Sequence, residues 1–260
     1  MLLLASLAVL VGCANVEAVV PTRIQAGGGR FDVFVSRQVE REMIKRKFPL
    51  RKVIQTDLDR IAAKLPGPAT AVNLTVGNPD EILASVGATE FTDPETGGVT
   101  IGLFPFWSEE PVNFSQQLAR TLARAIDRSV RITTGAGLGK TLLDQLVTDG
   151  AATAFGEAVF PGTPDPWVNA LTAQQVCRQW HHLQPVLAKM GLHDEVLLGG
   201  SVSPTTFGES SMPFLTGRAI GYQIVADYLA HETPVSWRTL ANTPTTEIFQ
   251  ASDYSPCPAS

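Results

Sequence analysis

The stretch TLARAIDRSVRITTGAGLGKTLLDQLVTDGAATAF, residues 121–155, decides the fold because it predicts two helices joined by a glycine-rich turn. Around its start, apolar residues recur at every fourth position, which is the period of one buried helix face; this row consists of Phe114, Leu118, Leu122, Ile126 and Val130. After the glycines, a second helix is predicted over residues 138–159. Gly135, Gly137 and Gly139 separate the two helices and indicate a flexible connection.

The connection resembles a phosphate-binding loop because it ends in Gly139-Lys140-Thr141. That motif requires another glycine five residues before Gly139, and this position is Thr134. It also requires a strand ahead of the loop, whereas a helix is predicted there. The segment therefore indicates a helix–helix connection with a solvated lysine, and a nucleotide site is not expected.

Upstream of these helices, the period of the sequence changes. Residues 71–76 (AVNLTV) and 99–104 (VTIGLF) alternate and contain β-branched residues, so both are predicted strands of a small sheet. The segment 31–65 has a helical pattern and predicts two helices broken near Pro49. Downstream, Thr172 is the expected N-cap of a further helix, and the helical segments predicted there are 172–190, 214–231 and short pieces within 235–250. The expected fold class is α+β and mostly helical.

Composition and charge limit the classes of function that the chain could have. The chain has 260 residues, 44% of them hydrophobic, which is enough for one domain with a large core. The formal net charge of −5 and the pI of about 5.4 argue against a nucleic-acid partner, because such proteins present a basic face. The most basic segment is Arg41–Lys52. We interpret it as the solvated face of a helix and its exit, with a membrane or anion-binding patch as the alternative.

The N-terminus indicates export. Residues 1–13 read MLLLASLAVLVGC, an apolar run too short to span a bilayer but typical of the apolar region of an export signal. Leu10-Val11-Gly12-Cys13 resembles the lipobox of bacterial lipoproteins, in which the cysteine receives lipid. We therefore expect a signal peptide over residues 1–12, a tether over 13–30 and a single domain over 31–260. The alternative is a buried N-terminal helix with a chance cysteine.

A lipidated Cys13 places the chain in the cell envelope, facing the periplasm and bound to the membrane through its lipid. Ala14 and Asn15 follow the cysteine, and no aspartate stands at the second mature position. By resemblance to inner-membrane retention signals, where that aspartate matters, the outer membrane is favoured in a Gram-negative host. In this oxidising compartment Cys177 and Cys257 are expected to form a disulfide. Three cysteines without a C-x-x-C pair do not make a thiolate zinc site by themselves.

Three blocks of the sequence resemble a bacterial family of predicted zinc-dependent proteases, which has a zincin-like fold. Residues 121–123 (TLA) match the opening of the family's site helix, T-L-A-H-E-x-x-H, and residues 143–152 match a helix with an S-E-G-x-A motif whose glutamate is the third metal ligand. Residues 216–225 match a G-Y-x-x-G-Y-x-I-V block. The resemblance extends over residues 71–254. It implies a small sheet packed on a site helix and a ligand helix.

The residues that would perform the chemistry differ from the family pattern. By the resemblance, the two histidine ligands fall on Arg124 and Arg128, the general-base glutamate on Ala125, and the third ligand on Asp149. An arginine offers no lone pair to zinc, and an alanine cannot take a proton from water. These four positions are therefore interpreted as a vestigial metal site, without metal, cofactor or catalytic residue.

Two residues of the third block are expected to line a vestigial cleft beside the former metal site. Arg218 replaces the first tyrosine of the third block, and Tyr222 retains the second. Asp149 shares an apolar stripe with Leu142, Leu146 and Thr153 and is therefore expected to be partly buried. One hypothesis places an Arg124–Asp149–Arg128 cluster where zinc stood, since arginine pairs carboxylates in a bidentate manner. The alternatives are two solvent-facing arginines, or two arginines that bind an anionic ligand in the cleft.

Residues elsewhere in the chain give little support for a metal or hydrolase site at another place. His181 and His182 are adjacent, so on a helix they point about 100° apart, and they are interpreted as a solvated face beside Trp180. His193 lies in a predicted loop, and the chain has no G-x-S-x-G nucleophile motif. The sequence thus predicts a lipid-anchored envelope protein with a degenerate zinc-protease fold and a binding or scaffold role. Its ligand would be a protein or an anionic small molecule. The alternatives are an active zinc metallopeptidase with a misaligned or relocated site, and an exported binding module unrelated to zincins.

Overall fold

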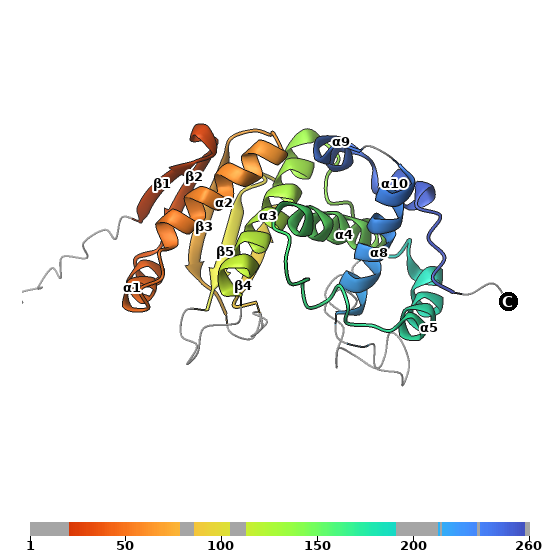
Figure 1. Ribbon diagram of the computed structural model, residues 1–260. Helices are drawn as coiled ribbons and strands as arrows, with labels where there is room; N and C mark the ends of the chain where they lie inside the picture. Colours follow the sequence, from red (N-terminus) through yellow and green to blue (C-terminus); the bar gives the residue numbers. More distant parts are fainter. Residues whose placement is uncertain are drawn as a thin grey trace, which may run out of the picture.

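The computed structural model describes residues 21–78, 86–104, 113–190, 213, 215–232 and 235–257. A five-stranded sheet forms one side of the molecule, with the order β1-β2-β3-β5-β4 (Figure 1). Its strands are β1 (Thr22–Ala26), β2 (Phe31–Val35), β3 (Thr70–Val76), β4 (Ala88–Thr92) and β5 (Val99–Leu103). The three central strands are parallel, and both edge strands run antiparallel to their neighbours.

Helices cover this sheet and connect its parallel strands. α1 (Arg37–Lys45) and α2 (Leu50–Lys64) form the crossover from β2 to β3, and the chain breaks between them at Pro49 as predicted. α3 (Phe114–Thr134) packs against β4 and β5, with its predicted apolar row buried. Because α3 is buried along most of its length, polar residues on it also lie inside the protein.

The C-terminal half is helical and packs on the other side of α3 (Figure 1). Its elements are α4 (Leu142–Val159), α5 (Ala173–Leu183), the 3-10 turn η3 (Gln184–Val186), α8 (Thr216–His231), α9 (Trp237–Asn242) and α10 (Thr245–Ala251). One apolar core lies between the sheet, α2 and α3, and a second lies among α4, α5, α8 and α10. The fold is mostly helical α+β, which confirms the predicted class.

α4 and α8 cross at two glycines. A Cβ atom on Gly150 would overlap the backbone carbonyl of Gly221, and one on Gly221 would overlap the carbonyl of Leu146. Both glycines lie in blocks that carry the family resemblance. They bring the backbones of α4 and α8 together, and this fixes the positions of Asp149 and Arg218 beside the crossing.

The structure corrects the expected N-terminal boundaries. Residues 22–30, expected in the tether, form β1 and the 3-10 turn η1 (Gly27–Gly29), and residues 31–35, expected in a helix, form β2. The physical reason is alternation: Phe31, Val33 and Val35 are buried while their neighbours are half-buried. The glycines take positive φ and turn the hairpin instead of serving as a linker.

Two helix ends also differ from expectation. α4 begins at Leu142, four residues later than predicted, because Thr141 caps it in a capping box with Asp144. α5 ends at Leu183 and not at residue 190, since Pro185 follows and the chain continues as a 3-10 turn. Thr172 caps α5 as predicted. Among the described residues, no helix combines the length and apolar character that crossing a bilayer requires.

Candidate functional site

Three arginines form a row on α3 that faces the interior. Arg120, Arg124 and Arg128 lie four residues apart, so their side chains leave the same face of the helix. The side chains of Arg120 and Arg124 are 0% and 1% exposed, and that of Arg128 is 13% exposed. Guanidinium groups this deeply buried require anionic partners. The hypothesis that Arg124 and Arg128 face solvent is therefore wrong.

Arg124 holds two carboxylates together. Its Nε and Nη2 donate to the two carboxylate oxygens of Glu90 at 3.0 and 3.2 Å, and its Nη1 donates to Oδ2 of Asp165 at 2.7 Å. Nη2 also donates to the hydroxyl of Thr121 at 2.9 Å, and the guanidinium lies 4.8 Å from the centre of the Trp167 ring. Every nitrogen of this side chain is thereby engaged.

Arg128 joins Glu90 to the ligand helix. Its Nη1 donates to Oε1 of Glu90 at 3.0 Å, and its Nη2 donates to Oδ1 of Asp149 on α4. Asp149 is 3% exposed, so the predicted burial of this residue is confirmed. On its other side Arg218 of α8 approaches, with Nε 3.5 Å from Oδ2 of Asp149. Asp149 therefore lies between two arginines, but these are Arg128 and Arg218.

Arg120 closes the network at its other end. Its Nη1 lies 2.9 Å from Oε1 of Glu157 and 3.3 Å from Oδ1 of Asp165, while its Nε donates to the carbonyl of Phe160 at 2.9 Å. The backbone N–H of Asp165 donates to the same oxygen of Glu157 at 2.7 Å. Two carboxylates thus share this arginine.

Together these residues form what we call the Arg–carboxylate network: Arg120, Arg124, Arg128 and Arg218 with Glu90, Asp149, Glu157 and Asp165. Four positive charges face four negative charges, so the network is neutral as a whole. Trp167 forms its apolar wall, since the guanidinium groups of Arg124 and Arg218 lie over its ring at 4.8 and 4.6 Å. The indole N–H of Trp167 donates to the hydroxyl of Thr153 at 3.2 Å.

The charged forms stabilise one another. Burial alone would raise the pKa of Glu90, but Arg124, Arg128 and Arg218 outweigh it and hold that pKa well below its usual range. Burial likewise opposes the charge of Arg124, yet Glu90 and Asp165 raise its pKa above the ordinary value. Burial raises the pKa of Glu157, which lies at the half-buried end of the network. Glu90 therefore stays ionised at neutral pH.

The sequence identified part of this network. Arg128 and Asp149 pair as hypothesised, but Arg124 pairs with Glu90 and Asp165 instead of Asp149. The four-residue spacing of Arg120 from Arg124 was a signal for a longer row. Glu90 and Asp165 gave no such signal, because each meets the arginines only through contacts distant in the sequence.

Comparison with known families identifies the fold's relatives. The model of a family described as "Predicted Zn-dependent protease" matches residues 50–250 of the chain. The chain belongs to this family. No curated protein and no solved structure matches the chain.

For a predicted Zn-dependent protease, the decisive question is whether the residues in place suit zinc. Such a site requires neutral imidazole and carboxylate ligands with an open position for water. Arg124 and Arg128 present only N–H donors, and Asp149 already accepts from Arg128. Ala125, at the position of the general base, is buried and uses its carbonyl to accept from Thr92. The residues at these four positions do not fit zinc.

Tyr222 lies beside the network. It is half-buried on α8, and its pKa is raised by burial first and by Glu157 second. Arg218, the other expected cleft residue, is held over Trp167 and beside Asp149. The two arginines proposed as an anion site are thus already occupied by the protein's own carboxylates.

The glycine-rich connection between α3 and α4 also lacks the features of a phosphate loop. It follows a helix, and Gly135, Gly137 and Gly139 have positive φ. The Asp144 carboxylate accepts from the backbone N–H groups of Lys140 and Thr141, both at 3.0 Å. The N-terminus of α4 is therefore capped by an internal anion.

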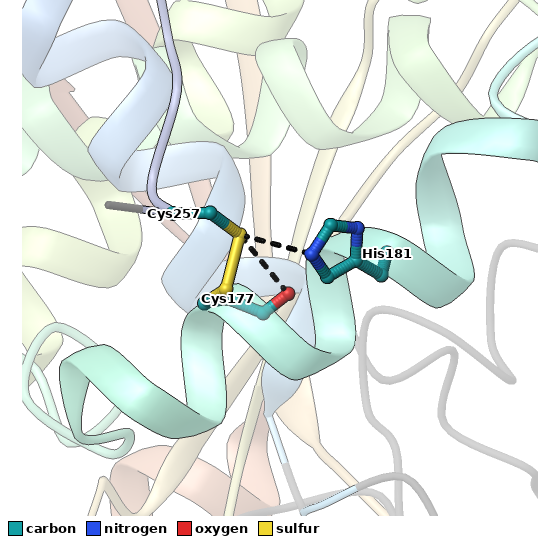
Figure 2. A group of neighbouring side chains, drawn as sticks. All are labelled: Cys177, His181 and Cys257. Carbon is teal, nitrogen blue, oxygen red and sulfur yellow. Dashed lines mark hydrogen bonds between the residues drawn. A yellow bond between two sulfur atoms is a disulfide. The ribbon is translucent and has the colours of Figure 1, made fainter. Parts of the chain in front are cut away.

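A second cluster joins α5 to the C-terminal tail. Cys177 and Cys257 form the predicted disulfide, with their Cα atoms 4.9 Å apart (Figure 2). His181 lies one turn after Cys177, and its Nε2 is 3.4 Å from the sulfur of Cys257. The four-residue spacing of Cys177 and His181 was a sequence signal for this cluster, whereas the adjacent pair His181 and His182 was not. Ligand atoms of the three residues lie within 4.8 Å of one another, but in the disulfide neither sulfur is a thiolate.

Several expected residues lie outside the described part of the chain. These are Cys13, with the whole signal peptide, and His193. Their predicted roles stay predictions.

Proposed function

We propose that this protein is a lipid-anchored, non-catalytic member of its protease family, with a binding or scaffold role at the cell envelope. The observation that carries the proposal is the Arg–carboxylate network, which includes three of the four vestigial positions, Arg124, Arg128 and Asp149. A metallopeptidase keeps an open metal position for water. Here charged side chains of opposite sign pair with one another in the equivalent space, although Oδ2 of Asp149 and Nε of Arg218 form no hydrogen bond with the described residues.

The chemistry of the network supports loss of activity and not merely a lower rate. Arg124 and Arg128 carry positive charge, which repels a divalent cation. Ala125 has no group to take a proton from water. Asp149 accepts a hydrogen bond from Arg128 and lies beside Arg218. Ligands, base and open coordination position are thus replaced together, and a single surviving carboxylate holds no catalytic zinc.

The envelope location rests on the lipobox-like Leu10-Val11-Gly12-Cys13 and on the apolar run ahead of it. The disulfide between Cys177 and Cys257 supports this location, because stable disulfides are typical of oxidising compartments. Cys13→Ser should abolish lipid attachment and processing at residue 13 in a bacterial host. A chain that stays uncleaved and membrane-bound when Cys13 is replaced contradicts the lipoprotein proposal.

Elemental analysis and a peptide-hydrolysis assay test the loss of catalysis. The protein purified without chelator or reductant should contain no stoichiometric zinc and should cleave no peptide. Reductant must be absent, because it would free Cys177 and Cys257 beside His181 and create a different metal site. The double variant Cys177→Ser, Cys257→Ser is the matched control.

One zinc per chain in this double variant, lost with a chelator together with a hydrolytic activity, would overturn the proposal. That result would favour the alternative of an active zinc metallopeptidase with a relocated site. Zinc that appears only after reduction of the wild-type protein, and not in the double variant, would place it at the cysteines. The proposal would then stand.

A further inference from the structure

Positive charge is concentrated in one short segment of an acidic protein. Residues 37–52 contain seven of the chain's 20 lysines and arginines, and only two acidic residues, Glu40 and Glu42. The segment therefore carries +5, while the whole chain carries −5, which leaves −10 for the remainder. Such an asymmetry creates a local positive field on an otherwise negative molecule.

The structure places this charge on one exposed face. Arg37, Arg41, Ile44 and Lys45 occupy successive turns on one side of α1, and all four are exposed. Ile44 is 68% exposed, although isoleucine is among the residues most often buried. The face therefore combines basic side chains with an apolar one that has no packing role inside the protein.

A groove continues this face toward α2. It has a volume of about 410 Å³ and lies between β1, β2, α1 and the start of α2. Its apolar lining includes Ile24, Met43, Ile44 and Phe48, and Arg51 and Lys52 stand at the side formed by α2. We call the exposed side of α1 together with this groove the basic face.

The two acidic residues of the segment are already engaged. Glu40 accepts a hydrogen bond from the Thr22 hydroxyl at 2.7 Å, and Glu42 pairs with Lys45 at 2.6 Å. Five basic side chains of the segment form no ion pair with any residue that the structure describes. These are Arg37, Arg41, Lys47, Arg51 and Lys52. Their charge remains available to an external anion.

Strand β1 begins beside the basic face. Thr22, one residue after the start of the described chain, lines the groove and contacts α1. From Cys13 to Thr22 there are nine residues, which span at most about 30 Å when fully extended. If Cys13 carries lipid, as the proposed function states, the basic face lies within that distance of the bilayer. The Arg–carboxylate network lies near β4, at the opposite edge of the sheet.

We propose that the basic face docks on an anionic phospholipid surface, with lipid phosphates against its arginines and lysines and Ile44 in the apolar boundary below them. This inference rests on the proposed lipid anchor for its biological setting, but the contact itself does not require the lipid. Docking orients the molecule with the Arg–carboxylate network directed away from the membrane. It also combines with a single anchor, since stable attachment takes two signals.

Vesicle binding by the full chain carrying Cys13→Ser tests this contact. Binding is compared between vesicles of pure phosphatidylcholine and vesicles in which phosphatidylglycerol replaces about a third of it. The test variant adds Arg41→Glu, Arg51→Glu and Lys52→Glu. The matched control adds Lys140→Glu, Lys189→Glu and Arg238→Glu, three exposed residues outside the basic face that change the net charge equally.

The unaltered basic face and the control should bind the anionic vesicles more tightly than the neutral ones. Each basic residue at such a surface strengthens binding roughly fivefold, so the test variant should bind anionic vesicles at least about a hundredfold more weakly. The apolar N-terminal run contributes equally in all three proteins. Its effect therefore cancels in the comparison.

A milder variant guards against misfolding. Arg51→Glu with Lys52→Glu places acidic residues in the first turn of α2, where they are favourable, and should still lose at least about 25-fold. Equal binding of the test and control variants to anionic vesicles would overturn the inference, as would equal binding of the unaltered face to both vesicle types. Neither result bears on the lipid anchor, because Cys13 is absent throughout.

Discussion

Glu90 accepts hydrogen bonds from Arg124 and Arg128 at once, and its side chain is 3% exposed. Each arginine has a second carboxylate partner, Asp165 for Arg124 and Asp149 for Arg128. The position of Glu90 between them means that loss of its charge affects both arginines. Water cannot replace it, because the site is buried.

Glu90→Gln is therefore expected to lower the free energy of unfolding by about 3–5 kcal/mol, the usual cost of removing one partner of a buried ion pair. Urea denaturation at neutral pH measures this loss. The matched control is Asp32→Asn, which breaks the exposed pair of Arg23 and Asp32 and should cost far less, because water screens that pair. Equal losses in the two variants would contradict a buried, mutually dependent network.

The stability difference between wild type and Glu90→Gln should depend on pH, and the pKa of Glu90 determines the direction of this dependence. The folded-state pKa of Glu90 lies well below its ordinary value of 4.5. Its charge therefore contributes full stability above pH 4.5, and this contribution is lost as the pH falls from there through the folded-state pKa. The stability difference between wild type and Glu90→Gln should shrink on acidification below pH 4.5. A constant difference would mean that another effect of the substitution dominates.

Only some residues of the Arg–carboxylate network could be predicted from the sequence. Asp149 was predictable as a buried residue because it continues the apolar stripe of Leu142 and Leu146. Glu90 and Asp165 were not, since they lie 34 and 41 residues away from Arg124 in the chain. The partner of a buried charge depends on tertiary contacts, and helical or strand periodicity carries no information about them.

The crossing of α4 and α8 determines how the ligand helix sits. Gly150 and Gly221 allow the two backbones to approach so closely that neither position has room for a side chain. In contrast, a Cβ atom on Gly156 of the same helix would lie 3.5 Å from its nearest neighbour, the carbonyl oxygen of Arg120, which is an ordinary contact. The two glycines of α4 therefore serve different purposes.

Gly150→Ala should destabilise the protein by about 3 kcal/mol or more, because the clash is with backbone and cannot be relieved by a rotamer change. Gly156→Ala should instead stabilise it by about 0.5–1 kcal/mol, since alanine is favoured over glycine inside a helix. Thermal unfolding of both variants measures the two effects. Two losses of similar size would show that α4 has no special approach at Gly150.

The elements themselves were unequally predictable. α3 was clear from the sequence because its apolar row continues over five turns, from Phe114 to Val130. β1, β2 and β4 were missed, whereas β5, which is equally short, was predicted because Val99 and Ile101 mark its alternation. The triple glycine near 27–29 was also ambiguous, as both a linker and a hairpin turn use glycine.

At the scale of the whole molecule, one covalent bond ties the C-terminal tail to the helical half. The disulfide links Cys177 on α5 to Cys257 and closes a loop of 80 residues that includes α8, α9 and α10. Loop-closure entropy then stabilises the folded chain by about 4–5 kcal/mol at most. The bond is the main covalent constraint on that half.

Cys177→Ser with Cys257→Ser is expected to lower the melting temperature markedly, whereas Cys13→Ser in the same background should leave it unchanged. Calorimetry on the proteins without reductant measures both. The reason is that replacing Cys177 and Cys257 opens a closed loop in the unfolded state, whereas replacing Cys13 does not. An unchanged melting temperature in the double variant would show that packing alone holds the tail.

The neutrality of the Arg–carboxylate network makes it costly for this chain to gain zinc ligands by substitution. A return from Arg124 to histidine would leave Glu90 and Asp165 without the cation that they share. Even simultaneous reversion at the four ligand and base positions would leave both acids in the interior. We therefore expect chains that regain zinc ligands one substitution at a time to be less stable than the present one.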